Sequence, residues 1–285
     1  MIELDRVSFT YREGEPDAVP ALRDLSLKID PGQFVAVIGH NGSGKSTLVK
    51  LLTAVLHPPT EGEVRVDGIP VRHDTRWGIR RRVAVVFQDP DDQLVMNRVA
   101  DDVAFGPENL GLPREEIGRR VDFALGAMEL GGLADRIIDD LSLGQKQRVA
   151  IAGALAMRPR FLILDEPTSL LPVGAAMGLI EAARELNRRE GMGVIHVTHS
   201  MAEAALFERV IVLDEGRVVL DGTPAEVFRH VDGLREIGLD VPLAASLAHR
   251  LRACGVPLEG DILTEADLRA AVAILPRSVA KDPGR

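Results

Sequence analysis

The sequence predicts an α/β protein built on an open sheet whose central strands are parallel. Three short runs are apolar throughout, as expected of strands that are buried on both faces: Phe34–Ile38, 161–164 and 194–197. Patterns of helical period separate these runs, including 149–157 and 175–189. Because open α/β sheets bind ligands outside the carboxyl ends of their strands, we expect functional residues directly after these runs.

The segments around this core have other patterns. Residues 1–10 and 22–29 alternate apolar and polar side chains, which is typical of half-buried strands. Between Pro90 and Asp140 the pattern changes to amphipathic helical segments broken by Gly and Pro. We therefore expect a helical insert in that part of the chain.

The pattern changes again after Phe228. Three leucines at four-residue spacing form an apolar stripe, namely Leu243, Leu247 and Leu251. Thr264, followed three residues later by Asp267, resembles a capping box at the start of another apolar helix. Residues 276–285 are interpreted as a frayed polar end. The tail is thus predicted to be a small helical extension.

Composition restricts the class of function. The chain has 285 residues, enough for one large domain or one domain with a small appendage. Its net charge of -9 argues against a protein that binds duplex DNA, and the basic run 76–82 is interpreted as a solvated helix face. The single cysteine, Cys254, excludes an internal disulfide, and the seven histidines show no metal-ligand spacing.

Hydropathy points to the cytosol. No apolar run approaches the ~20 residues of a membrane-spanning helix, and no charged-then-apolar leader is evident. A role at a membrane would therefore need a partner.

The stretch 39–47, G-H-N-G-S-G-K-S-T, matches the phosphate-loop pattern G-x-x-x-x-G-K-[ST] between a predicted strand and a helix. Glycines let backbone N–H groups surround phosphates, and the helix N-terminus adds partial positive charge. Lys45 can reach the β- and γ-phosphates, and Ser46 can offer its hydroxyl to Mg²⁺. The expected nucleotide contacts are Gly39, Asn41, Gly42, Ser43, Gly44, Lys45, Ser46 and Thr47.

Polar side chains follow the other buried runs. Asp165 is suited to hold Mg²⁺ and Glu166 to polarise an attacking water, although two acids can also simply close a strand at a turn. His199 can contact the γ-phosphate and steady the water, whereas His196 faces the core and is structural. Gln88, after another apolar run, can reach the metal or the water.

These motifs, taken in order, resemble the ATPases of ABC transporters. The matching stretches are 39–47 (Walker A), Gln88 (Q-loop), 141–145 (L-S-L-G-Q, signature), 162–167 (L-I-L-D-E-P, Walker B) and 198–200 (T-H-S, H-loop). Tyr11 matches the aromatic that stacks on adenine in this family, although it can also be an ordinary strand-end tyrosine. The cofactors implied are ATP and Mg²⁺.

The resemblance covers about residues 1–228 and implies a P-loop ABC cassette. Such a cassette has a mixed sheet core, an antiparallel β subdomain and a helical subdomain, here at about 90–158. Residues 229–285 would form the C-terminal helical extension, either as a cap on the cassette or as an element that stabilises a dimer.

A narrower resemblance is to energy-coupling-factor importers of vitamins or transition-metal ions. It rests on the stretches 87–95 (F-Q-D-P-D-D-Q-L-V), 101–109 (D-D-V-A-F-G-P-E-N), 236–242 and 261–265. It implies a second ATPase subunit, often a different chain, beneath a transmembrane energy-coupling protein and a substrate-capture membrane protein. The chain would then be peripheral to the cytoplasmic face of the cell membrane, and the insert after Gln88 would carry the groove for the membrane partner.

Two elements depart from the family pattern, and both would complete the ATP site of the opposite chain. The signature residues Ser142, Gly144 and Gln145 are present, but Leu143 replaces a glycine. If that position needs a positive φ, a non-glycine residue costs roughly 1–2 kcal/mol. In T-S-L-L-P-V-G an acid is missing before Pro172.

Every motif that would act on the chain's own nucleotide is intact, so the departures suggest an asymmetric dimer. The expected function is hydrolysis of ATP to power an importer. The alternative is a catalytically impaired ATP-binding subunit with a structural or regulatory role. A soluble ABC ATPase of translation or DNA repair is disfavoured by the single cassette, the net acidity and the lack of a long coiled-coil insert. The sequence does not identify the transported solute.

Overall fold

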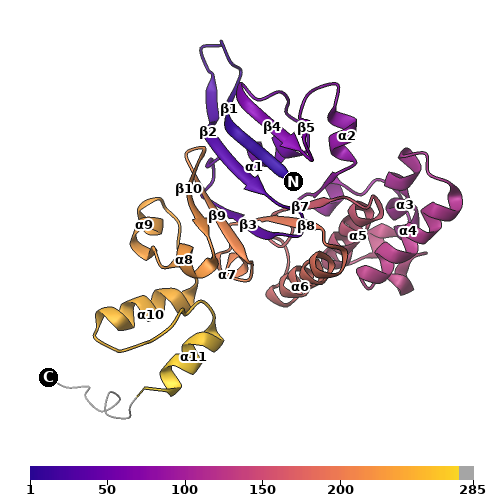
Figure 1. Cartoon of the computed structure of the whole chain (residues 1–285). Coiled ribbons are helices and arrows are strands. Elements are labelled where there is room, and N and C mark those ends of the chain that lie inside the picture. Colours follow the sequence, from indigo (N-terminus) through magenta and orange to yellow (C-terminus); the bar gives the residue numbers. More distant parts are fainter. Residues whose placement is uncertain (276–285) are drawn as a thin grey trace.

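The core of the computed structural model, which describes residues 1–275, is a six-stranded mixed sheet (Figure 1). Its strand order is β10-β9-β3-β8-β7-β6; the five strands from β9 to β6 are parallel, and β10 pairs antiparallel with β9. The bounds are β3 Phe34–Ile38, β6 Val83–Val86, β7 Phe161–Asp165, β8 Gly193–Val197, β9 Arg209–Asp214 and β10 Arg217–Gly222. The predicted α/β fold class is confirmed.

A second, antiparallel sheet lies over one face of the core sheet (Figure 1). Its order is β2-β1-β4-β5, with bounds β1 Ile2–Tyr11, β2 Val19–Ile29, β4 Glu61–Val66 and β5 Ile69–Pro70. The strands over 1–10 and 22–29 were predicted from their alternation. Strand β4, in which Val64 and Val66 are buried, and the apolar strand β9 add to the predicted strands.

Helices cover both faces of the core sheet, so successive side chains of β3 enter different cores. Val35 and Val37 pack with helix α1 and the antiparallel sheet, whereas Phe34, Ala36 and Ile38 pack with α3 to α6. The helices and short helical turns before the tail are α1 Lys45–Leu52, α2 Arg76–Arg80, η1 Pro90–Asp92, α3 Val99–Asn109, α4 Arg114–Ala127, η2 Gly131–Leu133, η3 Ile138–Asp140, α5 Leu143–Ala156, α6 Val173–Glu190 and α7 Met201–Ala204.

The tail is helical, as predicted, but its leucine stripe does not pack as a helix core face. Helix α8, Pro224–Phe228, ends the cassette, and the tail helices are α9 Val231–Glu236, α10 Leu243–Ala253 and α11 Glu265–Ala273. Helix α10 buries its alanine face, while Leu243 is 85% exposed. The predicted capping box of Thr264 and Asp267 is present. The predicted frayed end, 276–285, lies outside the described residues.

Helix α6 begins directly after the position of the missing acid. Pro172 is its N-cap residue, and the first turn, which starts at Val173, has neither a side-chain cap nor an acid. An N-cap carboxylate would accept hydrogen bonds from the first N–H groups and favour the positive end of the helix dipole. The absent acid therefore also costs the helix its cap.

We predict that Pro172→Asp stabilises the chain. Relative to Pro172→Ala, which also removes the proline ring, the free energy of unfolding should rise by about 0.5–2 kcal/mol because Asp caps α6. Urea denaturation of both variants measures this difference. Equal stability of the two would show that α6 gains nothing from a cap.

Candidate nucleotide site

The phosphate loop joins β3 to α1 at the carboxyl edge of the core sheet. Gly44 has a φ of 105°, and a Cβ there would lie 2.7 Å from the carbonyl oxygen of Ala21, so this position needs glycine. Lys45 lies inside the loop and donates to the carbonyl oxygens of Gly39 (2.7 Å) and His40 (3.0 Å). The loop is thus curled around its own lysine.

Three charged groups crowd this edge. Burial lowers the pKa of Lys45, although Glu166 and Asp165 attract its charge and oppose the shift. Burial, and then repulsion by Glu166, raise the pKa of Asp165 against the attraction of Lys45. Two carboxylates held together in a partly desolvated place favour a cation between or beside them.

Glu166 and His199 form a contact at the same edge. His199 Nδ1 lies 3.2 Å from Glu166 Oε2, and the imidazole is 62% exposed. The backbone N–H of Glu166 donates to the carbonyl of Val197 (2.9 Å), which joins the turn after β7 to β8. Glu166 has a φ of 53°, a backbone strain that is commonly found in functional sites.

The other predicted residues of this chain's own site lie around that edge. Gln88 is exposed just beyond β6, the neighbour of β7. The Tyr11 hydroxyl, at the end of β1, lies 3.1 Å from the Thr47 hydroxyl on α1. Within the loop, Asn41, Gly42 and Ser46 are exposed, whereas the Ser43 hydroxyl is buried and has no partner among residues 1–275. That unpartnered hydroxyl suits a phosphate oxygen.

The signature residues lie at the start of α5, in the helical part of the chain. Ser142 is the N-cap, and it forms a capping box with Gln145, whose Oε1 accepts from the Ser142 N–H at 2.9 Å. Leu143 is the first helical residue and does not have a positive φ, so the strain considered for a leucine here does not arise. A Cβ on Gly144 would lie 3.9 Å from Leu171, so the signature and the loop after β7 adjoin.

His40 was missed as a candidate. Its Nε2 lies 2.8 Å from Asp214 Oδ1 and its Nδ1 lies 2.6 Å from the Asn41 carbonyl oxygen. Through these two contacts the His40 ring joins the phosphate loop to the end of β9. Asp214 follows 174 positions later in the sequence, so nothing local signals the pair.

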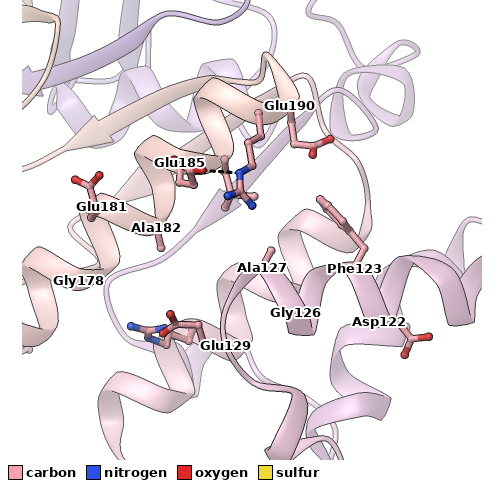
Figure 2. Close-up of a pocket in the computed structure, with 13 residues that line it drawn as sticks. Asp122, Phe123, Gly126, Ala127, Glu129, Gly178, Glu181, Ala182, Glu185 and Glu190 are labelled. Carbon is pink, nitrogen blue, oxygen red and sulfur yellow. Dashed lines mark hydrogen bonds and ion pairs between the residues drawn. The ribbon is translucent and has the colours of Figure 1, made fainter.

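A large groove lies elsewhere, between α4 and α5 on one side and α6 on the other. Figure 2 shows its acidic side chains on α6, including Glu181 and Glu185, opposite Phe123 and the small residues of α4. Its volume is about 870 Å³, and none of its lining residues belongs to the phosphate loop. The nucleotide edge is instead an open surface in the single chain.

The described residues 1–275 contain no helix that is long and apolar enough to cross a membrane. The same part of the chain holds no group of three or more His, Cys, Asp or Glu side chains placed to bind a metal ion. A metal at the phosphate edge would therefore need ligands of another kind, such as hydroxyl, amide and phosphate oxygens.

Comparisons with known proteins identify the same family as these motifs. The family model described as ABC transporter matches residues 22–169. The energy-coupling factor transporter ATP-binding protein EcfA1 of Caldanaerobacter subterraneus subsp. tengcongensis is 49% identical over 265 residues, which cover 93% of this chain and 95% of that protein.

Two solved structures are similar throughout the cassette. CbiO1 from Clostridium perfringens, described as part of the ABC transporter complex cbiONQ, has a TM-score of 0.76 at 36% identity and covers 87% of this chain and 98% of its own. The ATP-binding cassette MJ0796, solved as a dimer in a post-hydrolysis state bound to ADP and Pi, has a TM-score of 0.69 at 33% identity and covers 79% and 99%.

We predict that Asp165→Asn raises the melting temperature at pH 7 in the absence of nucleotide. Asp165 binds its proton more tightly in the folded than in the unfolded chain, so its ionised form destabilises the fold at neutral pH. The advantage of Asn should shrink as the pH falls through the raised pKa and vanish below the unfolded-state value of about 4.

The matched control is Asp221→Asn, because Asp221 Oδ2 pairs with Arg209 Nη2 at 2.6 Å. That variant should melt lower than the wild type at pH 7. Thermal scans between pH 4 and 8 test both. A lower melting temperature for Asp165→Asn at pH 7 would contradict the conclusion that the ionised Asp165 carboxylate destabilises the fold.

Proposed function

Because this chain belongs to the ABC transporter family and is an ATPase of the energy-coupling factor type, we propose that it drives uptake of a vitamin or transition-metal ion by hydrolysing ATP at the carboxyl edge of β3, β7 and β8. The contact between Glu166 and His199 carries this proposal. It places a carboxylate that can take a proton beside an imidazole that can orient the attacking water and the γ-phosphate.

The phosphate loop residues bind the nucleotide. Backbone N–H groups of 39–47 and the ammonium of Lys45, released from its own loop carbonyls, hold the β- and γ-phosphates. The Tyr11 ring, anchored beside Thr47, stacks on adenine. These roles are supported by the open loop and the buried, unpartnered Ser43 hydroxyl.

The residues also suit Mg²⁺. The donors near the phosphates are the Ser46 hydroxyl, the Asp165 carboxylate and the Gln88 amide, all hard oxygen ligands. The repulsion that raises the pKa of Asp165 would be relieved by a cation. When bound with ATP, Mg²⁺ would neutralise phosphate charge. Glu166 is placed to take the proton of the attacking water, and His199 is placed to steady the γ-phosphate.

The chain works in a dimer of two ATPases. Ser142, Gly144 and Gln145 face the partner's ATP, and the loop from Ser169 to Pro172 adjoins them. The solved relative MJ0796 is a dimer, which supports this arrangement. The extension after Phe228 adds to the dimer contact through the exposed Leu243 side of α10.

The dimer is asymmetric. In this chain, the residues that act on its own ATP are complete, whereas Leu143 and the bare Pro172 cap alter the surfaces given to the partner. Because Leu143 has a helical backbone, its effect is the bulk of its side chain and not strain. The partner's ATP, completed by these altered loops, turns over slowly. A weaker candidate is a clamp subunit without productive turnover, which the same two departures favour.

Glu166→Gln tests the active site. Removing the base should lower ATP turnover and transport of the purified complex by about 10²–10⁴-fold, while ATP binding persists. Glu208→Gln, at an exposed position, serves as the control. The assignment is wrong if Glu166→Gln leaves both activities near wild type while the equivalent change in the partner abolishes them.

The membrane partner docks beside the segment after Gln88. Exposed apolar side chains gather in this segment and in α3, namely Phe87, Val95 and Phe105. The buried carboxylate of Asp102 accepts hydrogen bonds from the N–H groups of Val95 (2.8 Å) and Met96 (2.9 Å) and so fixes the loop that carries Val95. Docked through this surface, the chain would lie at the cytoplasmic face of the cell membrane, and residues 1–275 contain no helix that could cross it.

A charge on this surface should separate the subunits. Val95→Glu combined with Phe105→Glu should abolish co-elution with the transmembrane protein but leave ATP binding to the isolated chain intact, because neither side chain belongs to the phosphate loop. Val219→Glu, at a similarly exposed site on β10, is the control. Normal co-elution of the double variant would place the docking surface elsewhere.

A further inference from the structure

A partly buried carboxylate lies next to the turns of Glu166 and His199 and belongs to none of the motifs. Glu203 is in α7, the short helix after β8, and three donors converge on its Oε2. These are the hydroxyls of Thr168 (2.8 Å) and Thr198 (3.0 Å) and Nε2 of His196 (2.9 Å). This one oxygen atom of α7 thus binds both the end of β8 and the turn after β7.

Two of the donors flank the reacting groups. Thr168 is two residues beyond Glu166, in the turn that follows β7, and Thr198 directly precedes His199. The Thr198 hydroxyl also accepts from the N–H of Ser200 (3.0 Å), so His199 is held between two anchored residues. The carboxylate of Glu203 therefore ties the turn of Glu166 to the turn of His199.

The same contact reaches the loop offered to the partner. The carbonyl of Thr168 accepts from the N–H of Leu171 (2.9 Å), and the Ser169 hydroxyl donates to the carbonyl of Glu166 (2.9 Å). Thr168 thus anchors the loop after Glu166, and the position of that loop depends on the hydrogen bond from the Thr168 hydroxyl to Glu203.

Burial gives these hydrogen bonds weight. His196 is fully buried, and Thr168 and Thr198 are nearly so. Burial by itself would raise the pKa of Glu203, but the interaction with His196 and the two threonine hydroxyls outweigh it and leave the pKa below its ordinary value. His196 Nδ1 has no hydrogen-bond partner among residues 1–275, so the ring is held by the bond from Nε2 to Glu203 and by stacking on Phe207, whose ring centroid lies 5.0 Å away.

We propose that Glu203 is a positioning residue that sets the distance between Glu166 and His199 and, through Thr168, the placement of the loop donated to the partner's site. This inference rests on the proposed roles of Glu166 and His199. Glu203 itself touches neither nucleotide nor water; it fixes the groups that do. Loss of the hydrogen bond at Thr168 leaves the phosphate loop unchanged. ATP turnover should therefore fall while ATP binding stays the same.

The test compares Thr168→Val with Thr168→Ser in the assembled complex. Valine keeps the shape but loses the hydroxyl, whereas serine keeps the donor. Thr168→Val should lower kcat about 10- to 100-fold, since a small misplacement of reacting groups has that effect. KM for ATP should stay within about twofold, as expected when only transition-state interactions are lost.

Thr168→Ser should restore most of kcat. The control for loss of a buried threonine hydroxyl is Thr53→Val, whose donor bonds the carbonyl of Val49 (2.8 Å) at the far end of α1. Glu203→Gln, which keeps the shape and removes the charge, should follow Thr168→Val in direction.

The outcomes separate this inference from the proposed function. If Glu166→Gln is inactive but Thr168→Val has a normal kcat, the positioning role is wrong and the active site stands. The positioning role is also wrong if kcat and ATP binding fall together, or if Thr168→Ser is as slow as Thr168→Val. If Glu166→Gln is active, the proposed site itself is wrong.

Discussion

Pairing across three parallel strands fixes the phosphate edge. Val37 of β3 pairs with Val197 of β8, which in turn pairs with Asp165 of β7. Within two residues of this row lie Gly39, which begins the phosphate loop, His199 and Glu166. Because side chains alternate in a strand, a slip of one residue would reverse every side chain of that strand. The fully buried apolar side chains of these strands hold the row in register and thereby place the chemistry.

The carboxyl edge of the core sheet lowers the stability of the protein without nucleotide. Two carboxylates and a partly desolvated lysine lie together, Glu166 has a left-handed backbone, and a buried loop hydroxyl has no partner within residues 1–275. These features gather unsatisfied charge, unsatisfied polarity and backbone strain beside the phosphate loop. The two cores on either face of the sheet supply the stability that makes such a site tolerable.

The sequence was enough to predict those features that a local pattern determines. A continuous apolar run indicates a buried strand or helix, and the phosphate-loop motif between a strand and a helix indicates a nucleotide as the ligand. It failed where the partner is distant in the chain, as for His40 with Asp214 and Thr168 with Glu203. The sequence also did not predict which face of a helix is buried. Leucines at four-residue spacing predicted an apolar stripe on α10, but the residues that α10 buries are alanines. The backbone conformation of Leu143 likewise could not be predicted from the sequence.

The groove between α4 and α6 has a mechanical consequence. Its two walls meet over glycines and alanines, and the charged side chains around it pair along their own helices, as Glu185 does with Arg189, or within the α4–α5 layer, as Glu129 does with Arg148. Among residues 1–275, ion pairs of this kind do not join α5 to α6. The two helices are joined by apolar packing instead, because Leu155 of α5 and Leu179 and Ile180 of α6 belong to one buried cluster. A displacement of α5 is therefore passed to α6 through that apolar core and not through the charges that line the groove.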